Sequence, residues 1–431
     1  MTLPSNVDLL VVGAGSAGAA LAGHAAAKGL RVLCLDRRAL GDAGAHWVNG
    51  VGRDDFAAAG IDAPTGPELR GSDTRFHLLA GHGPERLMLS GHGVLEVDMR
   101  LLVARLQRRA AEAGATLVGD VRVLGREGQQ VHTSGGSVQA QFIADASGLS
   151  GVGLLESRPI GRSDICTAAQ AVHRVRDPAA ARAFLETYEV GEDETLCLSG
   201  VAGGYSILNV RVAHGEVSLL TGSIPADGHA SGLEMLRSFI AEQPWIGERV
   251  FGGHRPIPLG LPQPVLADGS VARLGDAAGQ VFAAHGSGIS AGMVAARMLA
   301  EALADGGGPE AYAVDWMRTH GGLFAAYDCF RRFSQRISLE QLRVLFRSGL
   351  LDQASAAAGL RQEIPRPPLD AVLAMPGALR EAGTPLAKAL VGTFAQMAAA
   401  LALYRAYPRA GALRGPWEAA AARLTDSRSA P

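Results

Sequence analysis

Residues 8–18 read DLLVVGAGSAG, and this stretch decides the fold. The apolar run DLLVV is typical of a short buried strand, and the alanine-rich sequence at 17–28 is typical of a helix. The glycines between them have the GxGxxG spacing of a tight turn, which brings backbone NH groups and the positive end of the helix dipole to a pyrophosphate. We therefore expect a nucleotide site here, formed by Gly13, Gly15, Ser16, Ala17 and Gly18.

A carboxylate stands where such a unit needs one. The second apolar run, 31–35, ends at Asp36. An acid roughly 20 residues beyond the glycines can accept hydrogen bonds from an adenosine ribose. Strand, turn, helix and acid are all present, so nucleotide binding is favoured over the alternative of a plain glycine turn between two core elements.

A second glycine segment, GDAAG at 275–279, lies far along the chain. The run 270–274 before it predicts a strand, and a long helix is expected over 288–304. A protein that binds only a nicotinamide nucleotide needs the first segment alone, whereas one that wraps an extended FAD needs both. The nucleotide domain is therefore expected to be discontinuous.

The intervening sequence predicts a second sheet, with strands at 165–175, 194–200, 205–212 and 216–224. Before it we expect strands at 75–80 and 86–90, a helix at 98–113, and a strand pair at 116–124 and 137–144. The predicted class is α/β, with a discontinuous Rossmann-like FAD-binding domain and an inserted antiparallel-sheet substrate domain, followed by a helical C-terminal region. The expected boundaries are 1–160 with 265–308, then 161–264, then 309–431.

Composition limits the function. The chain has 431 residues and a formal net charge of -2, so it can bury a large core but has no strongly basic face for nucleic acid. Its four cysteines are scattered and no HExxH or HxxxH spacing occurs, so neither disulfides nor a metal site are expected. We recognise no secretion signal in the N-terminal sequence, and we expect a cytoplasmic location. The uncharged stretch 389–404 is too short and polar for the roughly 20 apolar residues of a membrane span.

The order of the motifs resembles a known family. GAGSAG, the acid at the strand end, VDMR at 97–100, ADASG at 144–148 and GDAAG followed by HGSGISAG are similar to the FAD-dependent oxidoreductases of the geranylgeranyl reductase family. That family belongs to the group with the para-hydroxybenzoate hydroxylase type of fold. The resemblance implies FAD, with Arg100 at its phosphates or ribose and Asp276 at its ribityl chain. It also implies FAD contacts from Arg37, Val123, Asp145, Gly148 and Gly275.

The start of the helix expected at 288 is a further candidate contact for the cofactor. The segment HGSGI places small residues and unpaired NH groups at a helix N-terminus. A reduced flavin carries negative charge near its pyrimidine edge, and a helix N-terminus aimed there would stabilise that anion. The alternative is a glycine-permitted helix start packed against a sheet. The expected flavin contacts are Gly286, Ser287, Gly288 and Ile289.

The reacting groups are predicted less directly than the cofactor. His46 and Asn49 lie in a loop that passes the flavin in the resembled family, but members often carry a cysteine there, and this chain reads HWVNG. His285 could polarise the flavin or donate a proton to a substrate. Tyr205 is a further candidate proton donor, although GGYSILNV lacks the tryptophan and proline expected there. For each, ordinary packing is the alternative.

The C-terminal region changes character. From 311 to 359 it predicts helices in which arginines alternate with phenylalanines and leucines, and a helical pattern resumes over 369–405 after a proline break. Two interpretations stay open: a surface that meets a membrane or a greasy substrate, and a helix face packed on its own protein. Residues 425–431 are expected to be disordered.

The favoured function is hydride transfer between flavin N5 and a hydrophobic substrate, possible classes being isoprenoids and specialised metabolites. GDAAG followed by GSGI resembles the reductases more than the hydroxylases, which usually carry a histidine where Gly279 stands. A monooxygenase or halogenase-like enzyme of secondary metabolism is the alternative, and a flavin-bearing interaction protein with structural FAD is one of another class. The electron donor, NAD(P)H or ferredoxin, a reductase or peripheral membrane partner, and the oligomeric state are left open.

Overall fold

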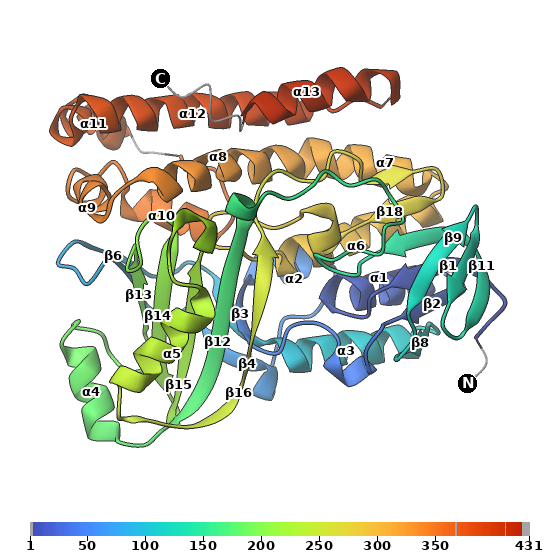
Figure 1. The fold of residues 1–431 in the computed structure, drawn as a ribbon, viewed down its shortest axis with the longest axis horizontal. Coiled ribbons are helices and arrows are strands. Elements are labelled where there is room, and N and C mark those ends of the chain that lie inside the picture. The colour runs from blue at the N-terminus through green and yellow to red at the C-terminus, as the bar shows by residue number, and fades with distance from the viewer. Residues whose placement is uncertain (1–2, 367–368, 410, 425–431) are drawn as a thin grey trace.

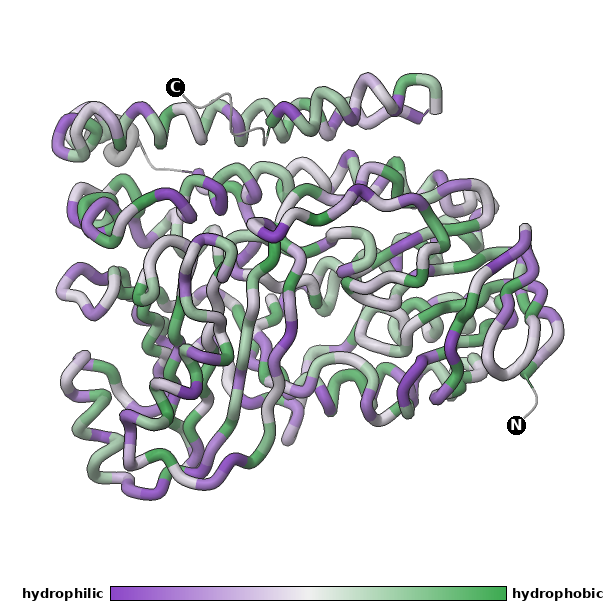
Figure 2. The backbone as a smooth tube through the Cα atoms, in the orientation of Figure 1, coloured by the Kyte–Doolittle hydropathy of each residue, from purple (hydrophilic) through white to green (hydrophobic). Residues whose placement is uncertain are grey.

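The computed structural model describes residues 3–366, 369–409 and 411–424, so the disorder expected at 425–431 lies outside the described residues. Two large sheets lie side by side, and the C-terminal helices cross above both (Figure 1). In Figure 2 the strands and helices are of mixed hydropathy, and hydrophilic stretches gather at many of the outer turns. The class expected from the sequence, α/β with a helical C-terminal region, is confirmed.

The first sheet has eight strands in the order β17-β18-β11-β1-β2-β8, and β10 joins β11 and β9 beside this path. The strands next to β1 run parallel to it, so their carboxyl ends lie at one edge of the sheet. The bounds are β1 (Asn6–Val12), β2 (Val32–Leu35), β8 (Thr116–Val118), β9 (Val123–Glu127), β10 (Gln130–Thr133), β11 (Gly136–Asp145), β17 (Ala267–Asp268) and β18 (Val271–Arg273).

Helices bury one face of the first sheet. Alanine and glycine dominate their contacts, which lets the backbones approach closely: a Cβ atom at Gly292 would lie 3.1 Å from Cβ of Ala17. The other face is covered by a smaller apolar cluster and the β9–β10 hairpin. The helices are α1 (Ser16–Ala27), α2 (Arg53–Ala58), α3 (Met99–Glu112) and α6 (Ile289–Ala304).

The second sheet has seven strands in the order β16-β12-β15-β14-β13-β5-β6. Helices α4 (Pro178–Glu186) and α5 (Gly232–Glu242) pack on one face. The strands are β5 (Phe76–Ala80), β6 (Arg86–Leu89), β12 (Ile165–Val175), β13 (Thr195–Ser199), β14 (Ser206–Ala213), β15 (Glu216–Ser223) and β16 (Ile246–Pro258). A small third sheet, β3 (Val48–Gly52), β7 (Val94–Asp98) and β4 (Leu69–Ser72), lies between the two.

Three details differ from the sequence-based expectations. The strand pair expected at 116–124 and 137–144 is wrong, because β8 pairs with β2, β11 pairs with β1, and Asp120 at φ +58° breaks the first run. Strands β5 and β6 belong to the second sheet, since β5 pairs with β13, although they precede residue 161. The long β16 was not predicted, because an edge strand with one exposed side does not alternate clearly.

The C-terminal region forms two helical layers. The first contains α7 (Gly308–Trp316), a π-helical turn (Met317–Gly321), α8 (Gly322–Arg336), α9 (Leu339–Arg347) and α10 (Gln353–Leu360). The second contains α11 (Leu369–Ala382), α12 (Thr384–Arg405) and α13 (Arg414–Leu424), and α12 lies along α8 (Figure 1). Tyr404 and Trp417 join the main core cluster, so this upper layer is anchored by aromatic packing.

Candidate functional site

Four strand ends bring the sequence motifs together at one edge of the first sheet. GAGSAG follows β1, Asp36 follows β2, ADASG ends β11 and GDAAG follows β18. A Cβ atom at Gly13 would lie 2.4 Å from the carbonyl oxygen of Ala146, and one at Gly275 would lie 3.4 Å from Cβ of Ala17. The two glycine segments are therefore neighbours, and at Gly13, where φ is +105°, only glycine fits.

Asp36 is held in the position expected for a ribose ligand. Its carboxylate is buried, and Oδ2 accepts a hydrogen bond of 2.9 Å from the backbone NH of Ala14. The other oxygen accepts from the NH of Arg38 at 2.9 Å. These bonds orient the carboxylate beside the glycine turn, as a nucleotide-binding βαβ unit requires.

Arg255 on β16 was missed by the sequence analysis. Its guanidinium donates to the carbonyl of Gly44, and a Cβ at Gly15 would lie 3.4 Å from Cα of Gly44. Burial lowers the pKa of Arg255, the charge of Arg38 lowers it further, and Asp276 acts in the opposite direction. No carboxylate within the described residues forms a salt bridge with Arg255. A half-buried cation beside the first glycine segment, without an ion-pair partner in the described chain, fits a diphosphate, and FAD carries one.

The other cofactor contacts implied by the resemblance differ in whether their side chains already have partners within the protein. Arg100 pairs with Asp98 at 2.6 Å and stacks 3.5 Å above the ring of Phe251. Asp145 accepts hydrogen bonds from the NH and hydroxyl of Ser147 in its own turn. The remaining residues stand as expectations: Arg37 is exposed, Val123 lies on β9, and Gly148 has φ +83°.

The start of α6 is open, as expected. Gly288 is the N-cap residue, and no side chain caps the helix. Asn49 on β3 donates a hydrogen bond of 3.1 Å to Oγ of Ser287. Asp276 lies next to this segment, since a Cβ at Gly288 would lie 3.1 Å from its Oδ1, and burial raises the pKa of its carboxyl group. The NH groups at the start of α6, the hydroxyl of Ser287 and the carboxyl of Asp276 thus lie close to one another.

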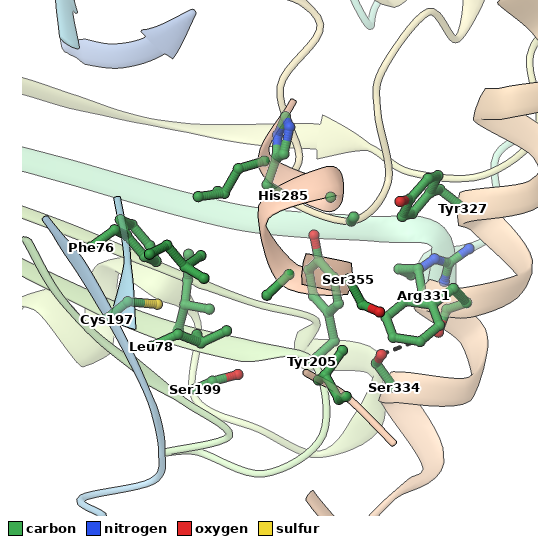
Figure 3. Close-up of a pocket in the computed structure, with 18 of the residues that line it drawn as sticks. Phe76, Leu78, Cys197, Ser199, Tyr205, His285, Tyr327, Arg331, Ser334 and Ser355 are labelled. Atoms are coloured by element: carbon green, nitrogen blue, oxygen red, sulfur yellow. Dashed lines mark hydrogen bonds between the residues drawn. The ribbon is translucent and has the colours of Figure 1, made fainter. Parts of the chain in front are cut away.

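A cavity of about 890 Å³ begins at this point. It lies between the free face of the second sheet and the C-terminal helices (Figure 3). The strands contribute side chains such as Phe76, Leu78 and Cys197, and α8 contributes Tyr327 and Ser334 opposite them. The size is at the upper end of small-molecule sites, and most of the lining is apolar.

Three of the four predicted reacting residues line this cavity: Asn49, Tyr205 and His285. Burial lowers the pKa of His285 to about 4, so its imidazole is neutral near pH 7. The hydroxyl of Tyr205 donates to the carbonyl of Ala283 at 2.8 Å, and burial raises its pKa. His46 is not among the lining residues, and its buried Nε2 has no hydrogen-bond partner within the described chain.

The arginines and phenylalanines of α8 divide between two roles. Arg331 is fully buried and forms ion pairs with Asp328 and with Asp164, which lies just before β12. Phe330 and Phe333 line the cavity. Arg331 therefore packs on its own protein, whereas the two phenylalanines border the cavity. Among the described helices, α12 is the one that is long and apolar enough to cross a membrane, by length and composition alone.

Among the described residues, no group of three or more histidine, cysteine or acidic residues is placed to hold a metal ion.

The fold is that of a class of flavoproteins. No protein-family model and no curated protein sequence matches the chain. Solved structures do match: a geranylgeranyl bacteriochlorophyll reductase-like protein from Thermoplasma acidophilum has a TM-score of 0.70 at 18% identity, over 90% of this chain and 99% of that one. The chain therefore has the FAD-binding fold of the para-hydroxybenzoate hydroxylase type, as the motif order predicted.

Two further likenesses show how widely this fold is used. The myxobacterial chondrochloren halogenase, an FAD-dependent halogenase, has a TM-score of 0.60 at 17% identity, over 89% of this chain and 91% of that one. PqsL from Pseudomonas aeruginosa in complex with 2-aminobenzoylacetate has a TM-score of 0.52 at 18% identity, over 82% and 99%. At these identities the likeness defines the fold, and the reaction must be argued from the site.

Proposed function

We propose that the chain binds FAD and is an FAD-dependent oxidoreductase acting on a hydrophobic small molecule. One observation carries the proposal: the large apolar cavity starts at Asn49, His285 and Ser287, next to GDAAG and the open start of α6. A reacting molecule in the cavity would thus lie beside the cofactor site. Bound FAD would supply a hydride acceptor or donor at N5.

In this proposal each part of the chain has a separate task. The turn at Gly13 and the guanidinium of Arg255 would hold the diphosphate, while Asp36 and Asp276 would bind the sugar hydroxyls. The NH groups at the start of α6 would stabilise negative charge on the reduced ring. His285, kept neutral by burial, can exchange a hydrogen bond with substrate without adding charge.

The experiment is a reconstitution followed by a redox cycle. Protein purified with added FAD should retain the cofactor through gel filtration, and the flavin absorbance should bleach with NADH, NADPH, reduced ferredoxin or dithionite under anaerobic conditions. Reoxidation by an added hydrophobic alkene would support hydride transfer to an isoprenoid-like or specialised metabolite. Failure to bind FAD, or a flavin that no donor and acceptor pair can cycle, would sink the proposal.

Oxygen chemistry is the second candidate, because halogenases and a monooxygenase share the fold. It predicts that reduced protein consumes oxygen in step with substrate hydroxylation or halogenation. Oxygen uptake that yields only hydrogen peroxide, with and without candidate substrates, would leave hydride transfer as the better explanation. A purely structural FAD, the remaining alternative, fits poorly with a large cavity that opens beside the cofactor site.

A membrane-side entrance is part of the proposal. Phe394 on α12 lines the cavity although the residue is 41% exposed, and Val391 beside it is 51% exposed. An apolar substrate could pass from a bilayer into the cavity along this face. Cosedimentation with phospholipid vesicles tests it: wild type should bind, and the double variant Val391→Ser, Phe394→Ser should not. Equal sedimentation of both would contradict this entrance.

A further inference from the structure

The floor of the cavity contains one amide group that the protein leaves unused. Asn209 lies on β14 and faces the cavity. Its Oδ1 is buried and has no hydrogen-bond partner in the part of the chain that the structure describes. A buried polar group without a partner destabilises the folded protein, so such a group usually has a function.

The neighbours of Asn209 on the sheet do not need a polar side chain at this position for packing. In register beside it lie Cys197 on β13 and Leu220 on β15, and Leu78 lies beyond Cys197. The amide therefore projects from an apolar strip of the sheet. A leucine would fill the same space without an unsatisfied oxygen.

A second amide on the same face behaves differently. Gln170 lies on β12, across Leu220 from Asn209, and also lines the cavity. Its Nε2 donates to the carbonyl of Val48 at 2.7 Å, and its Oε1 accepts from the NH of Val48. Gln170 thus has a structural task, since it holds β3 against the second sheet, whereas the amide of Asn209 has none.

The charges around the cavity limit what the amide could bind. Arg211 is paired with Glu96 and Asp193, and Arg331 is paired with Asp328 and Asp164. An anionic substrate would find no unpaired cation among these described lining residues. The cavity therefore suits a neutral molecule.

We propose that Asn209 is a specificity residue that hydrogen-bonds a neutral amide, hydroxyl or carbonyl group on an otherwise apolar substrate. As placed, Oδ1 is shielded from the cavity, and a rotation about χ2 presents either the oxygen or the NH2 group to a substrate, so the amide can accept or donate. Two strand spacings separate Asn209 from Gln170, so the recognised group would lie roughly 10 Å from β3 and the reacting end of the cavity. The inference rests on the proposed function only in taking this cavity as the substrate site.

The test measures binding without using the flavin. Displacement of the neutral fluorophore Nile red would report affinities for three matched compounds: biphenyl, biphenyl-4-carboxamide and biphenyl-4-carboxylate. Wild type should bind the carboxamide about tenfold more tightly than biphenyl and should bind the carboxylate most weakly. In Asn209→Leu the preference for the carboxamide should fall to about twofold or less, while biphenyl should bind at least as well as before.

Controls keep the outcomes distinct. Cys197→Ala changes the neighbouring side chain in register and should keep the carboxamide preference. Biphenyl binding by Asn209→Leu shows that the variant is folded. An undiminished carboxamide preference in Asn209→Leu, or tighter binding of the carboxylate by wild type, would overturn the inference. A protein that passes this test yet fails to cycle its flavin would sink the proposed reaction and leave the binding role of Asn209 standing.

Discussion

The side-chain amide of Asn49 donates a hydrogen bond of 3.1 Å to the hydroxyl of Ser287, a residue 238 positions later in the chain. The bond ties β3, which follows the first nucleotide-binding unit, to the segment that opens α6. Both residues line the cavity. The contact therefore sets the position of the helix N-terminus relative to any molecule that enters, and this is where the reaction would take place.

Breaking the Asn49–Ser287 contact should lower activity without releasing the cofactor. We expect Asn49→Ala and Ser287→Ala each to reduce kcat/KM about tenfold at unchanged FAD content, because the helix start loses its partner. Since both substitutions remove one interaction, the double variant should be close to either single one. Fully additive losses would show that the two residues act independently.

Arg255 should determine the affinity for FAD. Arg255→Gln removes the half-buried guanidinium that donates to the Gly44 carbonyl, and we expect the Kd for FAD to rise about tenfold or more. Quenching of flavin fluorescence during titration of the apoprotein measures it. Arg249→Gln, on an exposed position of the same strand, is the matched control and should leave the Kd unchanged. An equal rise in both variants would contradict a specific role for Arg255.

Local motifs account for what could be predicted from the sequence at this edge. GAGSAG, Asp36 and GDAAG each follow a short apolar strand, so spacing along the chain was sufficient to place them. Arg255 could not be found that way. It lies on β16, whose approach to the glycine turn depends on how the second sheet docks against the first, and its strand shows no apolar alternation.

The neutral state of His285 should appear in the pH dependence of stability. Its pKa is about 4 in the folded protein and 6.5 for the free side chain, because burial disfavours the imidazolium. Below pH 6.5 the unfolded chain takes up a proton that the folded chain refuses until about pH 4, so the free energy of unfolding falls as pH falls through this window. His285→Asn should flatten that decline in urea unfolding curves measured from pH 4 to 8.

His24 provides the control for this experiment. Burial lowers its pKa to about 4 as well, and it is not among the residues that line the cavity. His24→Asn should therefore flatten the decline in stability to a similar degree but leave turnover unchanged. A wild-type stability curve with no slope between these pH values would mean that neither imidazole is kept neutral by folding.

Arg331 should contribute strongly to the stability of the fold, unlike an arginine on the protein surface. Its side chain and that of Asp328 are both 0% exposed, and its second partner, Asp164, lies just before β12. Arg331→Met removes one of the two arginines that pair with the buried carboxylate of Asp328 and leaves it only the partly exposed Arg332, so the free energy of unfolding should drop by about 3 kcal/mol. Arg347→Met, half exposed on α9, should change it by less than about 1 kcal/mol. Urea denaturation measures both, and equal losses would contradict the distinction.

The same region shows where sequence patterns stop being informative. Arg331 and Arg347 have similar neighbours in the sequence, among phenylalanines and leucines, and both fit an amphipathic surface. Their environments in the structure differ, because Arg331 is paired with Asp164, which lies 167 residues earlier in the chain. Burial of a charge depends on partners that only the folded chain brings together.

Tyr205 should be a wall of the cavity and not the proton donor. Its hydroxyl is already committed to the carbonyl of Ala283, and burial raises its pKa, so giving up the proton is unfavourable. We expect Tyr205→Phe to keep kcat within about threefold while losing about 1 kcal/mol in the free energy of unfolding, since the Ala283 oxygen is left without its donor. A loss of a general acid would instead cost about a hundredfold or more in kcat, and that result at unchanged stability would restore Tyr205 as the proton donor.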